Sequence, residues 1–135
     1  MKDKLDLLIK RMKRRERFSM LSGEDDGTKA LSRLNIPKVR LSDGAFGVSA
    51  PETRTTCFPA PALLACSFDE ELLSETGKRL ANEAQHCGIN LVKSACLCIK
   101  RSPLAGKNYE GFSEDPYLSK SLAPVFCRSV QEQGM

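Results

Sequence analysis

Side chains that are mostly apolar recur every four residues in one long stretch of the chain. The members of this stripe are Leu72, Thr76, Leu80 and Ala84, and Leu73 widens it. This period predicts an amphipathic helix that runs to Cys87. Ser67 and Glu70 have the spacing of a capping box at its start. Gly88 stands where a helix commonly ends.

A second helical stripe begins after residue 115. Leu118, Leu122 and Phe126 repeat every four residues. Asp115 can accept hydrogen bonds from the first free N–H groups, and Pro116 suits the first helical position. Gly134 lies near the expected end. Pro124 falls inside this helix, where it removes a backbone donor.

The first third of the chain also predicts helix. Leu5, Leu8, Ile9 and Met12 fall on one face of a helix over residues 3–21, and Gly23 is the expected C-terminal cap. Residues 28–34 indicate a short second helix that ends before Ile36 and Pro37.

Short apolar runs separate these helices. Residues 38–42 predict the first strand, and the segment 89–99 contains another. The run 62–66 is consistent with a buried strand, although it is too short to prove one. Residues 49–57 have no period and are expected to form a loop. Strands that alternate with helices predict an α/β fold built of parallel βα units.

The size of the chain limits this fold. The sequence has 135 residues, which suffice for one modest domain, whereas a full (β/α)₈ barrel needs about 250 residues. Hydrophobic content of 41% and charged content of 28% are ordinary for a globular protein and argue against disorder.

The net charge of +4 comes from one segment, because residues 10–17 hold six bases and one acid. Clustered lysine and arginine attract phosphate, so binding to nucleic acid or another acidic surface is one hypothesis. A solvated helix face is the favoured interpretation because no aromatic side chain is interleaved, and we expect no nucleic-acid partner.

The six cysteines include no CxxC pair, so we expect no metal site. Without a secretory signal, we expect buried thiols instead of disulfides. We also expect no cofactor. His86 has no nucleophile pattern nearby and is expected to be structural. The chain has no apolar segment of signal-peptide or membrane-span length. We therefore expect a cytoplasmic location and no membrane partner.

Several motifs, in one order along nearly the whole chain, are similar to those of glycoside hydrolase family 3, the β-glucosidase-type enzymes. They are Leu21-Ser22-Gly23, residues 42–47 (SDGAFG), residues 57–65 (CFPAPALLA), Ser67-Phe68-Asp69 and the long run 99–116 (IKRSPLAGKNYEGFSEDP). The resemblance implies a (β/α)₈-type barrel followed by an α/β sandwich domain. This chain would then be one incomplete domain, a partial (β/α)₈ TIM-type barrel with a helical lead-in over 1–36 and the first few βα units over 37–135.

The resemblance also implies two substrate-binding residues. Asp43 occupies the place of the aspartate that grips sugar hydroxyls, and Lys107 stands where the family usually has a sugar-binding arginine. Lysine keeps the charge but loses the planar fork. Read from spacing alone, Asp43 could simply cap a turn before Gly44.

The sequence departs from the family pattern elsewhere. Ala45 and Ser49 replace a usual proline and arginine, and Lys13 replaces a helix-capping threonine. Residues 93–96 (KSAC) stand where the family has an apolar residue and a Gly-Pro-Gly-like turn. A lysine at position 93 fits a strand only where it faces solvent.

No catalytic residue is expected within this chain. Retaining glycosidases use two carboxylates, and the resemblance places the nucleophile on a later barrel strand and the acid/base beyond the barrel. Glu114 and Asp115 suit a helix N-terminus, and Glu110 is expected to orient neighbouring groups.

We therefore expect the N-terminal part of a β-glucosidase-like enzyme that is inactive alone. A β-glucoside or other glycoside is the expected substrate of the complete enzyme. A complementary C-terminal fragment is an expected partner, because half a barrel leaves a strand edge and an apolar face uncovered. The alternatives are a non-catalytic remnant, or an interaction protein that binds sugar through Asp43 and Lys107 or binds a polyanion.

Overall fold

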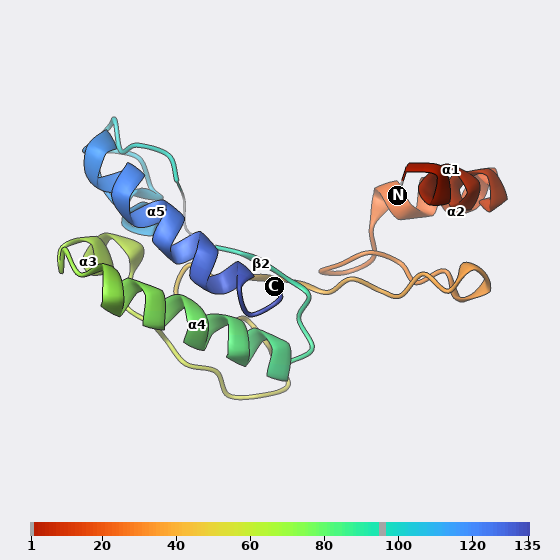
Figure 1. The fold of residues 1–135 in the computed structure, drawn as a ribbon, viewed down its shortest axis with the longest axis horizontal. Helices are drawn as coiled ribbons and strands as arrows, with labels where there is room; N and C mark the ends of the chain where they lie inside the picture. The colour runs from red at the N-terminus through yellow and green to blue at the C-terminus, as the bar shows by residue number, and fades with distance from the viewer. Residues whose placement is uncertain (1, 95–96) are drawn as a thin grey trace. The chain divides into compact units, whose positions relative to one another are not determined.

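The computed structural model describes residues 2–94 and 97–135. The chain divides into two compact units, one that ends at Leu41 and one that spans Ser42–Met135. The helices of both units are labelled in Figure 1. Among the described residues, none of the helices combines the length and apolarity that crossing a bilayer requires. The division into two compact units does not test the prediction that the chain is one incomplete domain.

The first unit contains two helices where the sequence predicted one. Helix α1 (Lys2–Arg11) and helix α2 (Arg14–Ser22) are separated at Lys13, whose backbone is extended (φ −67°, ψ 154°). The Lys13 N–H donates to Glu16 Oε2 at 2.7 Å, so Glu16 caps the second helix from inside its first turn. The predicted continuous helix over 3–21 was wrong because this local hydrogen bond competes with helix propagation. The predicted C-cap at Gly23 (φ 71°) is confirmed.

A bidentate contact joins α2 to a 3₁₀ turn, η1 (Ser32–Leu34). The helix predicted over 28–34 was too long, because only this turn forms within it. Arg33 donates from Nη2 to Glu16 Oε2 at 2.6 Å and from Nε to Glu16 Oε1 at 3.0 Å. These bonds, followed by the Lys13 N–H, lower the pKa of Glu16 to about 2. Asn35, in the left-handed region (φ 56°), ends the turn.

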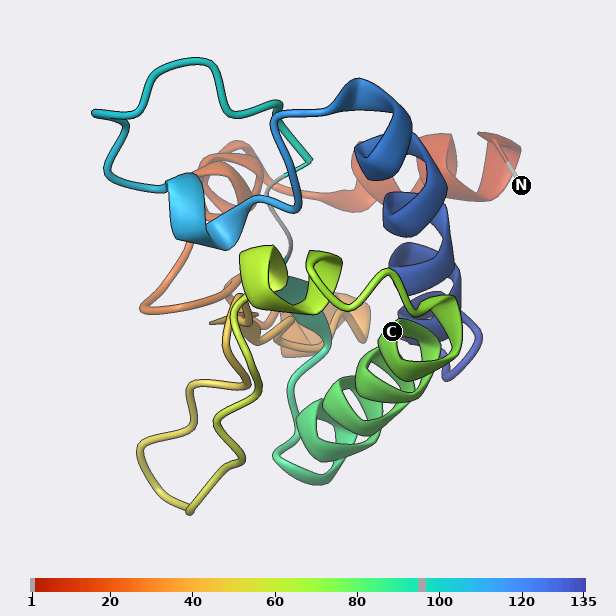
Figure 2. The ribbon, with the colours of Figure 1, turned by 90° about the vertical axis from the view of Figure 1, so that its left-hand side faces the viewer.

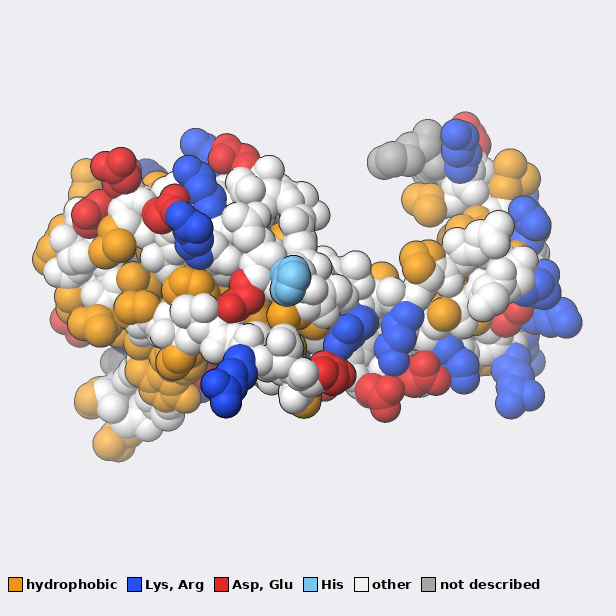
Figure 3. Space-filling view, turned by 90° about the horizontal axis from the view of Figure 1, so that it is seen from below, with side chains coloured by type: hydrophobic (Ala, Val, Ile, Leu, Met, Phe, Trp, Pro, Cys, Tyr) orange, Lys and Arg blue, Asp and Glu red, His pale blue; other side chains and the backbone are white. Residues whose placement is uncertain are grey.

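Lysine and arginine side chains lie over the surface of the first unit (Figure 3). Besides Lys13 and Glu16, the side chains of Arg14 and Arg17 in the basic stretch 10–17 have contacts inside the unit. The Arg14 guanidinium lies 5.6 Å from the centre of the Phe18 ring, and Arg17 Nη2 donates to the Ile9 carbonyl at 2.9 Å. The stretch is thus divided between two helices and partly engaged there.

Two long helices dominate the second unit. Helix α4 (Glu70–His86) and helix α5 (Pro116–Gln131) pack side by side (Figures 1 and 2). They bury Leu73 and Leu80 from α4 against a core that includes Leu122 and Phe126 from α5. Both predicted helices are confirmed, and their stripes face each other across this contact. Leu72 was wrongly placed in the stripe, because it is 46% exposed and Leu73 is the leucine that enters the core.

The contact requires a glycine. A Cβ added at Gly77 would lie 2.0 Å from Ser129 Oγ and 3.2 Å from the Phe126 carbonyl oxygen. Ser129 is buried, and its hydroxyl donates to that same carbonyl at 2.8 Å. The two helices therefore approach each other more closely than any side chain at position 77 would allow.

The sheet has two parallel strands, β1 (Leu41–Asp43) and β2 (Leu91–Lys93). The second strand lies inside the predicted segment 89–99, and the first is displaced toward the C-terminus from the predicted 38–42. The Gly44 N–H donates to the Lys93 carbonyl at 2.9 Å. The carboxyl ends of both strands are thereby held together.

The segment predicted as a strand over 62–66 is a helix, α3 (Pro61–Ala65), and that prediction was wrong. Pro61 occupies an early helical position, where its missing N–H costs nothing. Leu64 and Ala65 are buried on one side of the turn, which an apolar run of this length permits as readily as a strand.

The two long helices differ in how well their caps were predicted. The Asp115 carboxylate accepts from Tyr117 N at 2.9 Å and from Leu118 N at 3.2 Å, as predicted. At α4 the cap is Asp69, which accepts from Leu72 N at 2.9 Å. Ser67 instead donates its hydroxyl to the Leu64 carbonyl at 2.6 Å, so the predicted capping box was wrong.

The cysteine predictions are met in part. Cys57, Cys66, Cys98 and Cys127 are free thiols, as predicted, but the first three are exposed, so the expected burial was wrong for them. Cys96 lies outside the described residues. Among the described residues, groups of three or more metal-ligating side chains are absent.

We expect Gly77→Ala to destabilise the protein by about 2 kcal/mol, because the added methyl group overpacks the contact between α4 and α5. Alanine is otherwise the better helix former, so propensity alone predicts the opposite sign. Urea unfolding followed by circular dichroism measures the change. Gly106→Ala is the matched control, since nothing lies within 4 Å of the added Cβ; equal effects of both substitutions would contradict this account.

The Glu16–Arg33 pair predicts a pH dependence of the first unit. Because the folded pKa of Glu16 is depressed from an ordinary 4.5 to about 2, the contact stabilises the unit above pH 4.5 and is lost as the pH falls through about 2. The Arg33 Nε–H resonance should titrate with a midpoint near 2. Glu16→Gln should remove that transition, and a midpoint near 4.5 in the unaltered chain would refute the pairing.

Candidate functional site

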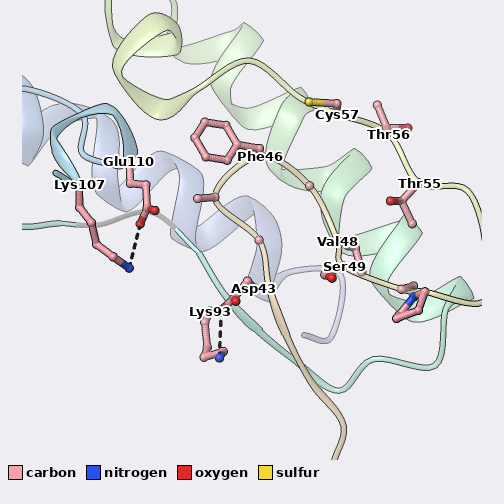
Figure 4. A pocket seen from close by; sticks show the side chains of 15 residues that line it. Asp43, Phe46, Val48, Ser49, Thr55, Thr56, Cys57, Lys93, Lys107 and Glu110 are labelled. Atoms are coloured by element: carbon pink, nitrogen blue, oxygen red, sulfur yellow. Dashed lines mark ion pairs between the residues drawn. The ribbon is translucent and has the colours of Figure 1, made fainter. Parts of the chain in front are cut away.

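Both predicted substrate residues, Asp43 and Lys107, line one open depression of about 530 Å³ in the second unit (Figure 4). Its walls are the loop that follows β1 (residues 43–51), residues 55–57, the end of β2 and the loop around the 3₁₀ turn η2 (Asn108–Glu110). Segments far apart in the sequence therefore meet at the carboxyl ends of parallel strands, where α/β proteins bind ligands.

The hydroxyl of Ser42 fixes the loop after β1. Ser42 is buried, and its Oγ accepts from Ser49 N at 2.8 Å. The same oxygen lies 2.7 Å from the Asp43 carbonyl and 3.2 Å from the Ser49 carbonyl, which are acceptors for its proton. One side chain thus closes residues 43–49 into a loop whose start carries Asp43.

Close backbone contacts shape the rest of this loop. A Cβ at Gly44 would lie 2.1 Å from Val92 Cγ1, so the loop leaves β1 directly over β2. Gly47 has a φ of 129°, and a Cβ there would lie 2.1 Å from the Thr56 carbonyl oxygen. Only glycine suits such a position, and the loop 43–51 is thereby held against residues 55–57.

The outer wall is fastened to α4. Thr56 donates from its backbone N at 2.8 Å and from Oγ1 at 3.0 Å to Glu83 Oε1. The Phe58 N–H donates to the Phe46 carbonyl at 2.7 Å. The two Thr56 bonds connect the loop 49–57, which was predicted correctly, to α4, and the Phe58 bond ties the chain just beyond that loop to the loop after β1.

Two ion pairs lie in the depression. Lys93 Nζ is 3.0 Å from Asp43 Oδ1, and Lys107 Nζ is 3.6 Å from Glu110 Oε2 (Figure 4). Asp43 and Lys107 are open to solvent, with side chains 82% and 80% exposed, whereas Glu110 is 20% exposed. Both predicted residues are therefore accessible to a ligand.

An aromatic pair borders the same wall. The rings of Phe46 and Tyr109 stack with centroids 5.3 Å apart and planes inclined by 19°. Phe46 lines the depression and follows β1, whereas Tyr109 lies in η2. The stack therefore packs the loop that carries Asp43 against the turn between Lys107 and Glu110.

Sequence reasoning missed Lys93 as a site residue and anticipated others. Its place at the end of a strand next to the strand of Asp43 was the available signal. Glu110 contacts Lys107, in keeping with the predicted orienting role. Asp115 caps α5, and His86, in the last turn of α4, is not part of the lining.

Comparison with known proteins shows which family shares the motifs found in the sequence. The model of the glycosyl hydrolase family 3 N terminal domain matches residues 6–135. The chain belongs to glycoside hydrolase family 3. The matched region includes both strands, all the helices of the second unit and every residue of the depression, so the resemblance noted in the sequence is confirmed.

The curated relatives are much longer than this chain. It is 39% identical to thermostable beta-glucosidase B of Acetivibrio thermocellus, over 95% of this chain and 18% of that protein. It is 38% identical to a putative beta-glucosidase of Schizosaccharomyces pombe, over 95% of this chain and 16% of that protein. The chain thus spans less than a fifth of these two proteins.

Solved structures show the same fold. Beta-glucosidase 3B from Thermotoga neapolitana, in complex with alpha-D-glucose, matches with a TM-score of 0.86 and 30% identity, over 98% of this chain and 22% of that one. Beta-glucosidase from Kluyveromyces marxianus, in complex with glucose, matches with a TM-score of 0.86 and 33% identity, over 96% and 16%. The predicted fold class is therefore confirmed, since this α/β chain matches part of the family's barrel domain.

Ser42→Ala should loosen the loop that carries Asp43. The substitution leaves the Ser49 N–H and the nearby carbonyls without their buried partner, at a cost of about 1–2 kcal/mol. Hydrogen exchange of the Ser49 amide should accelerate accordingly. Ser49→Ala is the matched control because it removes an exposed hydroxyl and keeps the backbone N–H; unchanged exchange in Ser42→Ala would show that the hydroxyl does not hold the loop.

Proposed function

We propose that this chain forms the N-terminal part of a β-glucosidase-like, retaining glycoside hydrolase, in which Asp43 and Lys107 bind the sugar. The observation that carries the proposal is their meeting in one accessible depression, although they come from loops more than sixty residues apart. The names of the relatives and the glucose in two of the similar structures support a glycoside as the substrate.

The chemistry of the two residues suits a sugar. A carboxylate accepts charge-assisted hydrogen bonds from hydroxyl groups, and the exposed oxygens of Asp43 can accept from two adjacent ones. Lys107 donates to ring or hydroxyl oxygens as a compact charge on a flexible stem. Lysine in place of the family's usual arginine keeps attraction for the ligand but fixes its orientation less.

The depression does not provide a pair of catalytic carboxylates. Retention requires a nucleophile and an acid/base about 5–5.5 Å apart. The carboxylates that line the depression are Asp43 and Glu110, and each forms an ion pair with a lysine ammonium. We propose that both catalytic groups come from the remainder of the enzyme and that the 135-residue chain is inactive alone.

The same proposal accounts for the exposed apolar surface of the second unit (Figure 3). Leu91 of β2, and Leu97 and Ile99 beyond it, are at least 40% exposed. Further barrel strands and their helices would cover these side chains and continue the sheet from its two strands. A complementary C-terminal fragment, or the rest of a longer chain, is the partner that this surface fits.

A chimera tests the proposed function. Residues 6–135 replace the matching segment of the beta-glucosidase B of Acetivibrio thermocellus, and hydrolysis of p-nitrophenyl β-D-glucoside is measured. The chimera should hydrolyse the glucoside, whereas the 135-residue chain alone should not. Asp43→Asn in the chimera should lower kcat/KM by about 100-fold, equivalent to about 2.7 kcal/mol of transition-state binding.

The control is Glu114→Gln in the same chimera, because Glu114 lies in the same segment as Lys107 but is not part of the lining of the depression. It should leave kcat/KM within about twofold. Hydrolysis by the chain alone, or equal effects of the Asp43 and Glu114 substitutions, would reject the proposal.

A further inference from the structure

Lys93 is a residue that the family pattern does not explain. Its ammonium contacts Asp43 at 3.0 Å, and the side chains of Lys93 and Asp43 are 55% and 82% exposed (Figure 4). We propose that Lys93 is a specificity-determining residue, which binds a vicinal diol of a neutral pyranose together with Asp43. This inference rests on the proposed function and adds a second binding group to its sugar site.

The geometry of the pair matches a diol. One hydroxyl can donate to the carboxylate of Asp43 while the oxygen of its neighbour accepts from the ammonium of Lys93. The two charged atoms are a hydrogen-bond length apart, as are neighbouring equatorial oxygens of a pyranose ring. The pair therefore offers an acceptor and a donor at matching separation.

The position of Lys93 is fixed by its backbone. Its carbonyl accepts from Gly44 N at 2.9 Å, and Ser94 Oγ donates to the Gly44 carbonyl at 2.8 Å. These bonds hold the end of β2 beside the end of β1. The pairing of the two strands thus places the Lys93 ammonium beside Asp43, and residues from outside this chain are not needed for this contact.

The existing ion pair does not compete strongly with a sugar. Exposed ion pairs contribute little to stability, because water already solvates both groups. A diol that inserts between Asp43 and Lys93, or bridges them, replaces solvent contacts at little cost. A deeply buried pair would resist such exchange.

The charge of the depression favours a neutral ligand over an anionic one. Lys93 and Lys107 are balanced by Asp43 and Glu110, and these four are the lysine and acidic side chains of the lining. A sugar acid would gain from the ammonium groups but would also meet both carboxylates. A neutral diol uses donors and acceptors without this repulsion.

The test is titration of the ¹⁵N-labelled 135-residue chain with methyl β-D-glucopyranoside, followed by the amide shifts of Asp43 and Lys93. We expect saturable shifts at both residues. Lys93→Met, which keeps the stem and removes the ammonium, should raise the apparent Kd about threefold to tenfold. Lys93→Arg, which keeps the positive charge, should bind the glucoside with a Kd close to that of the unaltered chain. Asp43→Asn should abolish binding. Lys120→Met, an exposed change on α5, is the control for loss of charge.

Each contrary result has a separate meaning. If Asp43→Asn abolishes the shifts but Lys93→Met leaves the Kd unchanged, the inference about Lys93 fails and the Asp43 subsite stands. If Asp43→Asn has no effect, or if no saturable shift occurs up to about 0.1 M sugar, both fail for this chain. Tighter binding of methyl β-D-glucuronide than of the glucoside would overturn the assignment of a neutral diol.

Discussion

The close approach of α4 and α5 at Gly77 is the contact on which the second unit depends. Because no side chain stands between the helices there, the leucines on either side of Gly77 reach the core that Phe126 completes. Phe112 is 3% exposed and packs edge-on against Phe126, with ring centres 6.2 Å apart. The long loop that carries Lys107 is therefore anchored in the same core, two residues beyond Glu110.

This dependence separates the parts of the chain that tolerate change from those that do not. A Cβ at Gly44 would collide with Val92, and Ser42 is enclosed by the loop that it holds. Lys93 and Asp43 point into solvent from the same strand ends. Their side chains can vary with little effect on folding, because an exposed group neither leaves a cavity nor loses a buried partner.

The sequence predicted those features whose cause is local. Asp115 and Pro116 start a helix through a carboxylate and a fixed φ, and both act within one turn. Asp43 and Lys107 were found because whole motifs resemble a family, and the structure brings them to one depression. Their sugar-binding roles stay predictions, since what the structure shows is their proximity and accessibility.

The missed features depend on contacts that a local pattern does not contain. Residues 62–66 are apolar in either a strand or a helix, and in α3 only Leu64 and Ala65 of them are buried, whereas Leu63 is 63% exposed. Both Ser67 and Asp69 are residue types that can cap α4, but the Ser67 hydroxyl donates instead to the Leu64 carbonyl at the end of α3.

Lys93 likewise depends on a contact that a local pattern does not contain. As a residue in a strand it is only unusual, and it acquires a chemical role when the parallel neighbour places Asp43 3.0 Å from its ammonium. Pairing across the sheet, and not composition, therefore turns an atypical substitution into a candidate binding group.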